Sequence, residues 1–354
     1  MYRRFKTTIY QICKSLGLFS LARRLTAGEL RILCYHGISI EDEHLYMPGL
    51  FMRPDTIRAR LAILTQNRYP VLPLNEALER LWAGNLPRCA VVITYDDGFY
   101  GNYRYGLELY GEYPLPTTIY VTTYYVQHQS PIFRHVVQYM FWKTNCSKLL
   151  LDELPGCDDG VLDLADSERA RRAMWALILK AESDYGEAER IELSCRLGFR
   201  LGVDYDELVR TRRLSLMTPE EVRTLAKTGI DIQLHTHRHQ FLPDKDNVTR
   251  EIEDNRSILE PLTEKPCNHL CYPSGVFAQQ QWPWLEGLGI VSATTCEPGL
   301  NNDQTERFGL RRFLDMESIT NLEFEAEVSG FAELLRRLFM RNVRTSVSPL
   351  EHGR

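Results

Sequence analysis

Residues 89–99 constrain the fold more than any other stretch, and they read Cys-Ala-Val-Val-Ile-Thr-Tyr-Asp-Asp-Gly-Phe. The small and β-branched residues at 90–93 predict a strand buried on both faces, as parallel strands are. Asp96 and Asp97 follow where that strand should end, and a turn at Gly98 would turn both carboxylates into one cavity. Two like charges beside an apolar core are unfavourable unless a cation lies between them. The stretch therefore predicts a metal, and the rest of the chain must supply its other ligands.

Short apolar runs alternate with amphipathic segments along most of the chain. β-branched runs predict strands, and apolar residues at helical spacing with capping residues predict helices. Besides the strand before Asp96, the predicted strands are residues 30–35, 69–72, 117–122, 230–234, 269–272, 290–295 and 308–313. The predicted helices between them are residues 54–67, 75–82, 102–110, 218–229, 248–262 and 284–288. Seven or eight strands with intervening helices favour a (β/α) barrel over an open doubly wound sheet, and no Gly-x-Gly-x-x-Gly turn follows any strand.

Residues 127–216 interrupt the alternation with helical patterns around an acidic loop, which holds Asp158, Asp159, Asp163 and Asp166. No linker rich in Pro, Gly or Ser marks either boundary, so we interpret this segment as a helical insertion and not as an independent domain. The expected organisation is a basic amphipathic helix over residues 1–28, a barrel over 29–345 and a tail over 346–354.

The first 25 residues contain six basic residues and no acidic one. Their apolar residues fall at helical spacing, at Tyr2, Phe5, Ile9, Ile12, Cys13, Leu16 and Phe19. The apolar run is too short and too interrupted for a cleaved signal peptide or a transmembrane helix. Two interpretations stay open: a helix lying on an anionic membrane surface, or an amphipathic helix packed on its own domain.

Charge and cysteine usage narrow the class of protein. The formal net charge of -5 at pH 7 gives no reason to expect a nucleic-acid partner. The nine cysteines are dispersed and never form a C-x-x-C pair, which is typical of a reducing compartment. We therefore expect a cytoplasmic protein, at the inner face of the membrane if its N-terminal helix binds there.

His235 and His239 follow a predicted strand and are four residues apart, so one turn can bring both imidazoles to one side. With one carboxylate they form a two-His-one-carboxylate set, which is typical of catalytic zinc and of non-haem iron. A second acid beside the first favours hydrolysis, because one carboxylate can bind the metal while the other accepts a proton from water. We expect His237, between the two ligands, to be solvated or to support them.

These motifs resemble those of the polysaccharide deacetylases, the NodB-like proteins of carbohydrate esterase family four. Thr94-Tyr-Asp-Asp-Gly98 is similar to the family's Thr-Phe-Asp-Asp-Gly motif, and His235-Thr-His-Arg-His239 to its His-[Ser/Thr]-x-x-His motif. The resemblance extends over residues 30–313 and implies a distorted (β/α) barrel. It also implies that Asp97, His235 and His239 bind a divalent metal, Zn²⁺, and that Asp96 is the general base.

Two residues that the family uses are absent from their usual places. The third motif usually has an Arg before Pro-Tyr-Gly, but here the segment is Cys271-Tyr-Pro-Ser-Gly275. We assign that role to Arg311, with the adjacent Arg312 as the alternative. The late Leu-x-His that supplies the general acid is also missing, and some relatives in exopolysaccharide synthesis place this acid in a Tyr-His context. We therefore expect His36, which follows Tyr35, to be the general acid; the alternative is a buried histidine bonded to backbone.

The expected function is metal-dependent removal of N-acetyl groups from an N-acetylated sugar or polysaccharide, in exopolysaccharide or cell-envelope glycan synthesis. Two alternatives stay open: a carbohydrate-binding barrel that has lost catalysis, and a deformylase or deacylase of a lipid-linked sugar. Tyrosines near the site could stack on sugar rings or belong to the core, namely Tyr100, Tyr103, Tyr105, Tyr124 and Tyr125.

Overall fold

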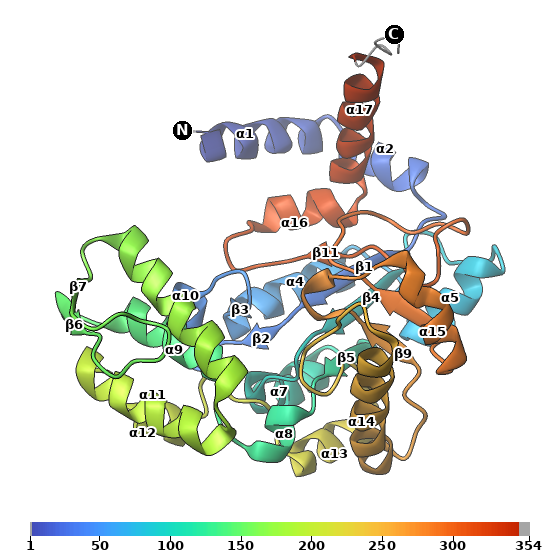
Figure 1. Ribbon diagram of the computed structural model, residues 1–354. Helices are drawn as coiled ribbons and strands as arrows, with labels where there is room; N and C mark the ends of the chain where they lie inside the picture. Colours follow the sequence, from blue (N-terminus) through green and yellow to red (C-terminus); the bar gives the residue numbers. More distant parts are fainter. Residues whose placement is uncertain (1, 347–354) are drawn as a thin grey trace, which may run out of the picture.

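Seven parallel strands form the central sheet of the computed structural model, which describes residues 2–346 (Figure 1). The strands are β1 (Arg31–Tyr35), β4 (Val91–Tyr95), β5 (Thr117–Val121), β8 (Asp231–Leu234), β9 (His269–Cys271), β10 (Ser292–Thr294) and β11 (Phe313–Leu314). Their order is β10-β9-β8-β5-β4-β1-β11, and every pairing among them is parallel. The prediction of a distorted (β/α) barrel of about seven strands is confirmed.

The segment before β11 connects the two edges of the curled sheet. Leu310 forms a parallel bridge with Thr294 of β10, and the chain then pairs with β1 through Phe313 and Leu314. The Leu310 amide donates to the Ala293 carbonyl at 3.0 Å, and the Thr295 amide donates to the Leu310 carbonyl at 2.8 Å. Residues 307–314 therefore close the barrel, although only two of them form a regular strand.

Alternation along the strands divides their side chains between two apolar clusters, because successive residues point to opposite faces. Ile32 and Val92 lie in the cluster that also contains the buried residues of α5 (Leu74–Trp82). Leu33 and Ile93 lie in the larger cluster, which the surrounding helices cover. Those helices include α4 (Pro54–Gln66), α6 (Tyr100–Arg104), α7 (Gly106–Glu112), α13 (Pro219–Lys227), α14 (Lys245–Thr263) and α15 (Trp282–Gly287).

Two predictions along the first third of the chain are wrong. The stretch between the predicted strand at 30–35 and the predicted helix at 54–67, for which no regular structure is predicted, contains α3 (Glu43–Tyr46) and β3 (Phe51–Met52), which pairs with β2 (Gly37–Ile38). Residues 69–72, expected as a strand, form only a bridge between Val71 and Val91. Pro70 has no amide hydrogen to donate to a ladder, which keeps that segment from extending.

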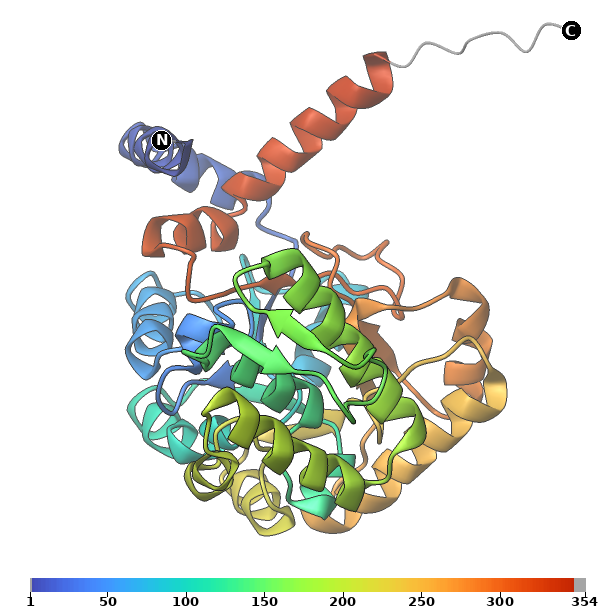
Figure 2. The ribbon, with the colours of Figure 1, turned by 60° about the vertical axis from the view of Figure 1, so that its left-hand side comes forward.

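The insertion packs against the barrel and shares its larger apolar cluster (Figure 2). It begins within α8 (Tyr124–His128) and contains α9 (Phe133–Lys143), α10 (Ser167–Asp184), α11 (Glu187–Leu201) and α12 (Tyr205–Thr211). The expected acidic loop is in part an antiparallel hairpin of β6 (Lys148–Leu150) and β7 (Val161–Asp163). Only Leu149 and Leu162 of these strands are buried, and so short an alternation gives little sequence signal.

Two helices, α1 (Tyr2–Ser15) and α2 (Leu18–Leu25), replace the single helix expected over residues 1–28. Gly17 between them has a φ of 76°, a left-handed conformation that ends the first helix. They lie at one end of the molecule with α16 (Asn321–Val328) and α17 (Phe331–Ser346) (Figure 1). The expected tail lies, from residue 347 onward, outside the described residues. Among residues 2–346, no helix is both long and apolar enough to cross a bilayer.

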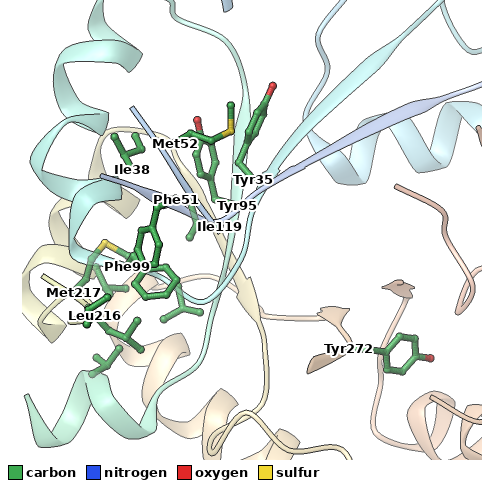
Figure 3. Packing of buried hydrophobic residues seen from close by; sticks show 14 of the residues in the cluster. Tyr35, Ile38, Phe51, Met52, Tyr95, Phe99, Ile119, Leu216, Met217 and Tyr272 are labelled. Carbon is green, nitrogen blue, oxygen red and sulfur yellow. The ribbon is translucent and has the colours of Figure 1, made fainter. Parts of the chain in front are cut away.

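Close packing beneath the site depends on glycine at position 101. Phe51 of β3 contacts Phe99 with ring centroids 4.8 Å apart, and Leu216 and Met217 pack beside them (Figure 3). Gly101 lies in the first turn of α6, and a Cβ there would lie 1.8 Å from the Ile38 carbonyl oxygen. The helix can approach β2 this closely only without a side chain.

We expect Gly101→Ala to lower the free energy of unfolding by about 1–3 kcal/mol or more, because backbone atoms must move to admit the methyl group. Gly111→Ala, in the next helix, is the matched control, since a Cβ there meets nothing within 4 Å. That change should be neutral or slightly stabilising, as alanine is the better helix former. Thermal and urea unfolding measure both effects, and equal stability of the two variants would contradict the packing argument.

Candidate active site

Four predicted site residues meet at the carboxyl ends of three strands of the central sheet. His36 follows β1, Asp96 and Asp97 follow β4, and His235 follows β8. All four line one cavity of about 600 Å³, as does His239. Functional groups gather at this end of a (β/α) barrel because the strand ends open into the connecting loops.

Asp97, His235 and His239 place three ligand atoms together. The Asp97 Oδ1 atom lies 3.2 Å from His235 Nε2 and 3.4 Å from His239 Nε2. His235 Nδ1 donates to the Cys271 carbonyl at 2.8 Å, which leaves Nε2 as the bare ring nitrogen facing Asp97. A metal-binding histidine is commonly oriented in this way, so the donor set fits a divalent metal.

The loops that carry these ligands are held in unusual backbone conformations. Asp97 has a φ of 68° and His239 a φ of 55°, both in the left-handed region that side chains disfavour. Asn255 of α14 stabilises the arrangement by accepting from the His235 amide at 3.0 Å and donating to the Val121 carbonyl at 3.0 Å. The sheet and α14 together therefore position the ligands.

Asp96 has a different partner from Asp97. Arg312 binds it through two parallel hydrogen bonds, with Nη1 at 2.7 Å from Oδ1 and Nη2 at 2.8 Å from Oδ2. Both side chains are buried. Burial alone would raise the pKa of Asp96, but the Arg312 guanidinium outweighs it and holds that pKa well below its ordinary range. Asp96 is therefore a fixed, ionised carboxylate beside the ligand set.

The assignment of Arg311 is corrected to Arg312. Arg311 is exposed, and its side chain lies along Gly299, whereas Arg312 points into the barrel. Successive residues of an extended segment face opposite sides, so only one of two adjacent arginines can reach the cavity. The sequence does not specify which one, because the register of residues 307–314 is set by bridges to β10 and β1.

His36 lies beside Asp96, with Nε2 at 3.8 Å from Asp96 Oδ2. Its Nδ1 atom is buried and has no hydrogen-bond partner among the described residues. The alternative of a histidine bonded to backbone therefore has no support in this structure. His237 does not line the cavity, and its Nδ1 atom is 2.9 Å from the Thr123 hydroxyl.

The insertion supplies part of the cavity wall, which no motif in the sequence indicates. Its contribution to the lining is Ile132, Arg134, His135, Gln138, Trp175, Glu182 and Arg190, and Tyr124 and Tyr125 of α8 lie just before it. Arg134 and Glu182 form a two-fold ion pair at 2.9 and 2.6 Å. His135 resembles His36 in having a buried Nδ1 without a partner among the described residues, and burial lowers its pKa to about 4. Tyr100, Tyr103 and Tyr105 are not among the lining residues.

Comparison with known proteins agrees with this architecture. The family model described as "Polysaccharide deacetylase" matches residues 158–293, a range that includes His235 and His239 but not Asp96 and Asp97. The sequence matches none of the curated proteins.

Several solved structures share the fold. The Streptococcus pyogenes deacetylase PplD, solved with acetate, is 16% identical with a TM-score of 0.57, over 86% of this chain and 99% of that one. A de-N-acetylase from Aggregatibacter actinomycetemcomitans is 13% identical with a TM-score of 0.53, over 84% and 98%. IcaB from Ammonifex degensii is 15% identical with a TM-score of 0.52, over 86% and 97%. The chain is therefore similar to the polysaccharide deacetylases over residues 158–293, and it shares its fold with solved structures of deacetylases.

Proposed function

We propose that the protein is a metal-dependent hydrolase that removes N-acetyl groups from an N-acetylated sugar or polysaccharide, in exopolysaccharide or cell-envelope glycan synthesis. One observation carries the proposal: the two adjacent carboxylates have separate partners in one cavity. Asp97 faces the two histidines, and Asp96 is paired with Arg312. The solved structures with this fold include a deacetylase with acetate and a de-N-acetylase, which supports the same reaction class here.

Asp97, His235 and His239 would hold the metal, for which we propose Zn²⁺. A divalent ion at such a site polarises a carbonyl oxygen and lowers the pKa of a nearby water. Two imidazoles and one carboxylate also suit non-haem iron, but a second ionised carboxylate in the same cavity favours hydrolysis over oxygen chemistry.

Asp96 has the position of a general base. Arg312 keeps it ionised and fixes both of its oxygens, so the carboxylate can accept a proton from the attacking water without reorienting. His36, whose Nε2 lies 3.8 Å from Asp96 Oδ2, would donate the proton that the leaving amine requires. Base and acid would then act on the same tetrahedral centre from adjacent strand ends.

The structure bears on both alternatives. The hypothesis of an inactive carbohydrate-binding barrel rested on the missing arginine and the missing late histidine. In the structure Arg312 binds Asp96 from behind the cavity, and His36 lines the cavity. Deacylation of a lipid-linked sugar uses the same chemistry. Residues of the insertion form part of the wall of the cavity, and its volume of about 600 Å³ favours a short glycan or a chain end. We therefore keep the lipid-linked sugar as the second candidate.

Acetate release from N-acetylglucosamine oligomers, with mass spectrometry of the products, tests the function. Asp97→Ala should lose bound metal in elemental analysis, because it removes the ligand that both histidines face. Asp96→Asn should keep the metal and lose turnover by about 10²- to 10⁴-fold, as expected for a general base. Full activity of Asp96→Asn would exclude it as the base, and stoichiometric metal with no product from any acylated sugar would favour a binding protein.

Arg312→Lys should lower kcat/KM by at least about tenfold, because lysine keeps the charge but cannot form the two parallel hydrogen bonds. Weaker pairing raises the pKa of Asp96, and activity requires the ionised carboxylate. The acid limb of the pH–rate profile should therefore move to higher pH. Arg311→Lys is the matched control and should leave the profile in place. If the two variants have the same profile, Arg312 does not tune the base.

His36→Asn should lower kcat by about a hundredfold or more while metal content stays normal, since the leaving amine would lack its proton donor. His135→Asn is the control, because that ring also lines the cavity and also has an unpartnered Nδ1. A substrate with an acidic leaving group should restore much of the rate of His36→Asn. Loss of activity in His135→Asn alone would instead make His135 the proton donor.

A further inference from the structure

Helices α1 and α2 lie at the end of the molecule that carries α17 (Figure 1), and this part of the chain has several exposed apolar side chains. We define the α1/α2 surface by five exposed residues, Ile9, Ile12, Leu16, Leu21 and Leu25. Leu16 is 71% exposed and Leu25 is 64% exposed, which leaves most of each side chain in water. Leu338 and Phe339 of α17, a helix that contacts α2, are also exposed. Large apolar side chains gathered in this way mark a contact surface.

The fold uses only part of the apolar side of α1. Tyr10 packs against Phe331 with ring centroids 5.8 Å apart, and Cys13 joins the same small cluster. Ile9, Ile12 and Leu16 follow one another at helical spacing on the neighbouring stripe and stay exposed. The apolar side of α1 is therefore wider than the part of it that packs against the rest of the protein.

Two ion pairs fix how α1 lies. Lys6 binds Glu323 at 2.9 Å and Lys14 binds Glu325 at 2.5 Å, both on α16. These contacts tie one side of the helix to the protein and hold its stripe in a defined orientation. The stripe therefore stays exposed although α1 is packed against the protein.

The basic residues around the α1/α2 surface favour an anionic partner. The first 25 residues contain six basic residues and no acid, whereas the whole chain has a net charge of -5. Arg24 is exposed between Leu21 and Leu25. An apolar stripe flanked by basic residues is the pattern of a helix that lies in the interface of an anionic bilayer. A symmetric dimer through this surface would bring two such basic segments together, whereas an anionic bilayer attracts them.

We propose that the α1/α2 surface docks the protein on an anionic lipid bilayer. The contact is peripheral, since Ile9, Ile12 and Leu16 enter the interface from one side of a helix that the protein holds on its other side. None of the residues that line the active-site cavity belongs to α1 or α2, so docking leaves the cavity free. This proposal does not depend on the reaction that the cavity catalyses.

Co-sedimentation of the full chain with vesicles tests the proposal. The protein should bind vesicles of phosphatidylglycerol and phosphatidylcholine, bind phosphatidylcholine alone at least about tenfold more weakly, and dissociate at high salt. The double variant Leu16→Gln/Leu25→Gln should bind at least about tenfold more weakly than the natural chain, because each leucine contributes apolar burial.

Leu179→Gln/Phe199→Gln, two exposed apolar residues of the insertion, is the matched control and should bind like the natural chain. Circular dichroism and hydrolytic activity should be unchanged in both double variants, because all four side chains are exposed. Absence of binding to anionic vesicles, or equal binding by both double variants, would overturn the proposal. Light scattering that shows a dimer which only Leu16→Gln/Leu25→Gln dissociates would also overturn it, by making a second copy the partner.

Discussion

The buried pair of Asp96 and Arg312 is the interaction on which the site and the closure of the barrel both depend. Arg312 donates from Nη1 and Nη2 to the carboxylate at the end of β4 and from Nε to the Thr295 carbonyl, at 2.8 Å, just after β10. The guanidinium thus links one strand in the middle of the sheet to the edge that residues 307–314 must close. A charge buried in a barrel is unfavourable alone, so each partner requires the other. The same pair that completes the fold keeps Asp96 ionised.

Asp97, the second carboxylate, has different neutralising partners from Asp96. Asp97 is adjacent in sequence but turns to the opposite partner set, because the chain adopts a left-handed conformation at this residue and at Gly98. A Cβ at Gly98 would come within 3.0 Å of Val121, so the turn leaves little space beside the next strand. Two neighbouring acids therefore acquire different neutralising groups, one a permanent cation and the other a pair of imidazoles that can share a metal. This separation makes a hydrolytic site possible.

The barrel carries the candidate reactive residues, and the insertion forms part of the cavity wall. The proposed metal ligands, the proposed base Asp96 and His36 all follow strands of the barrel, whereas Trp175, Arg134 and Glu182 come from helices between β5 and β8. Such a division lets the reacting groups stay on rigid elements while the wall that meets the substrate changes independently. None of the wall residues belongs to a recognisable motif, so their role is visible only after the insertion has packed on the barrel.

The amino-acid sequence by itself determined the parallel architecture, the two ligand motifs and the position of His36, because alternating apolar runs and the residues directly after them are local features. It did not determine which of Arg311 and Arg312 enters the barrel, since that choice depends on the register of an almost irregular segment between two distant strands. Nor did it predict the hairpin of β6 and β7 or the pocket histidine His135, whose burial arises from contacts between segments far apart in the chain. At the N-terminus the sequence showed an amphipathic pattern, but only the tertiary structure decided how much of its apolar side the protein covers, because that depends on the area α16 and α17 offer.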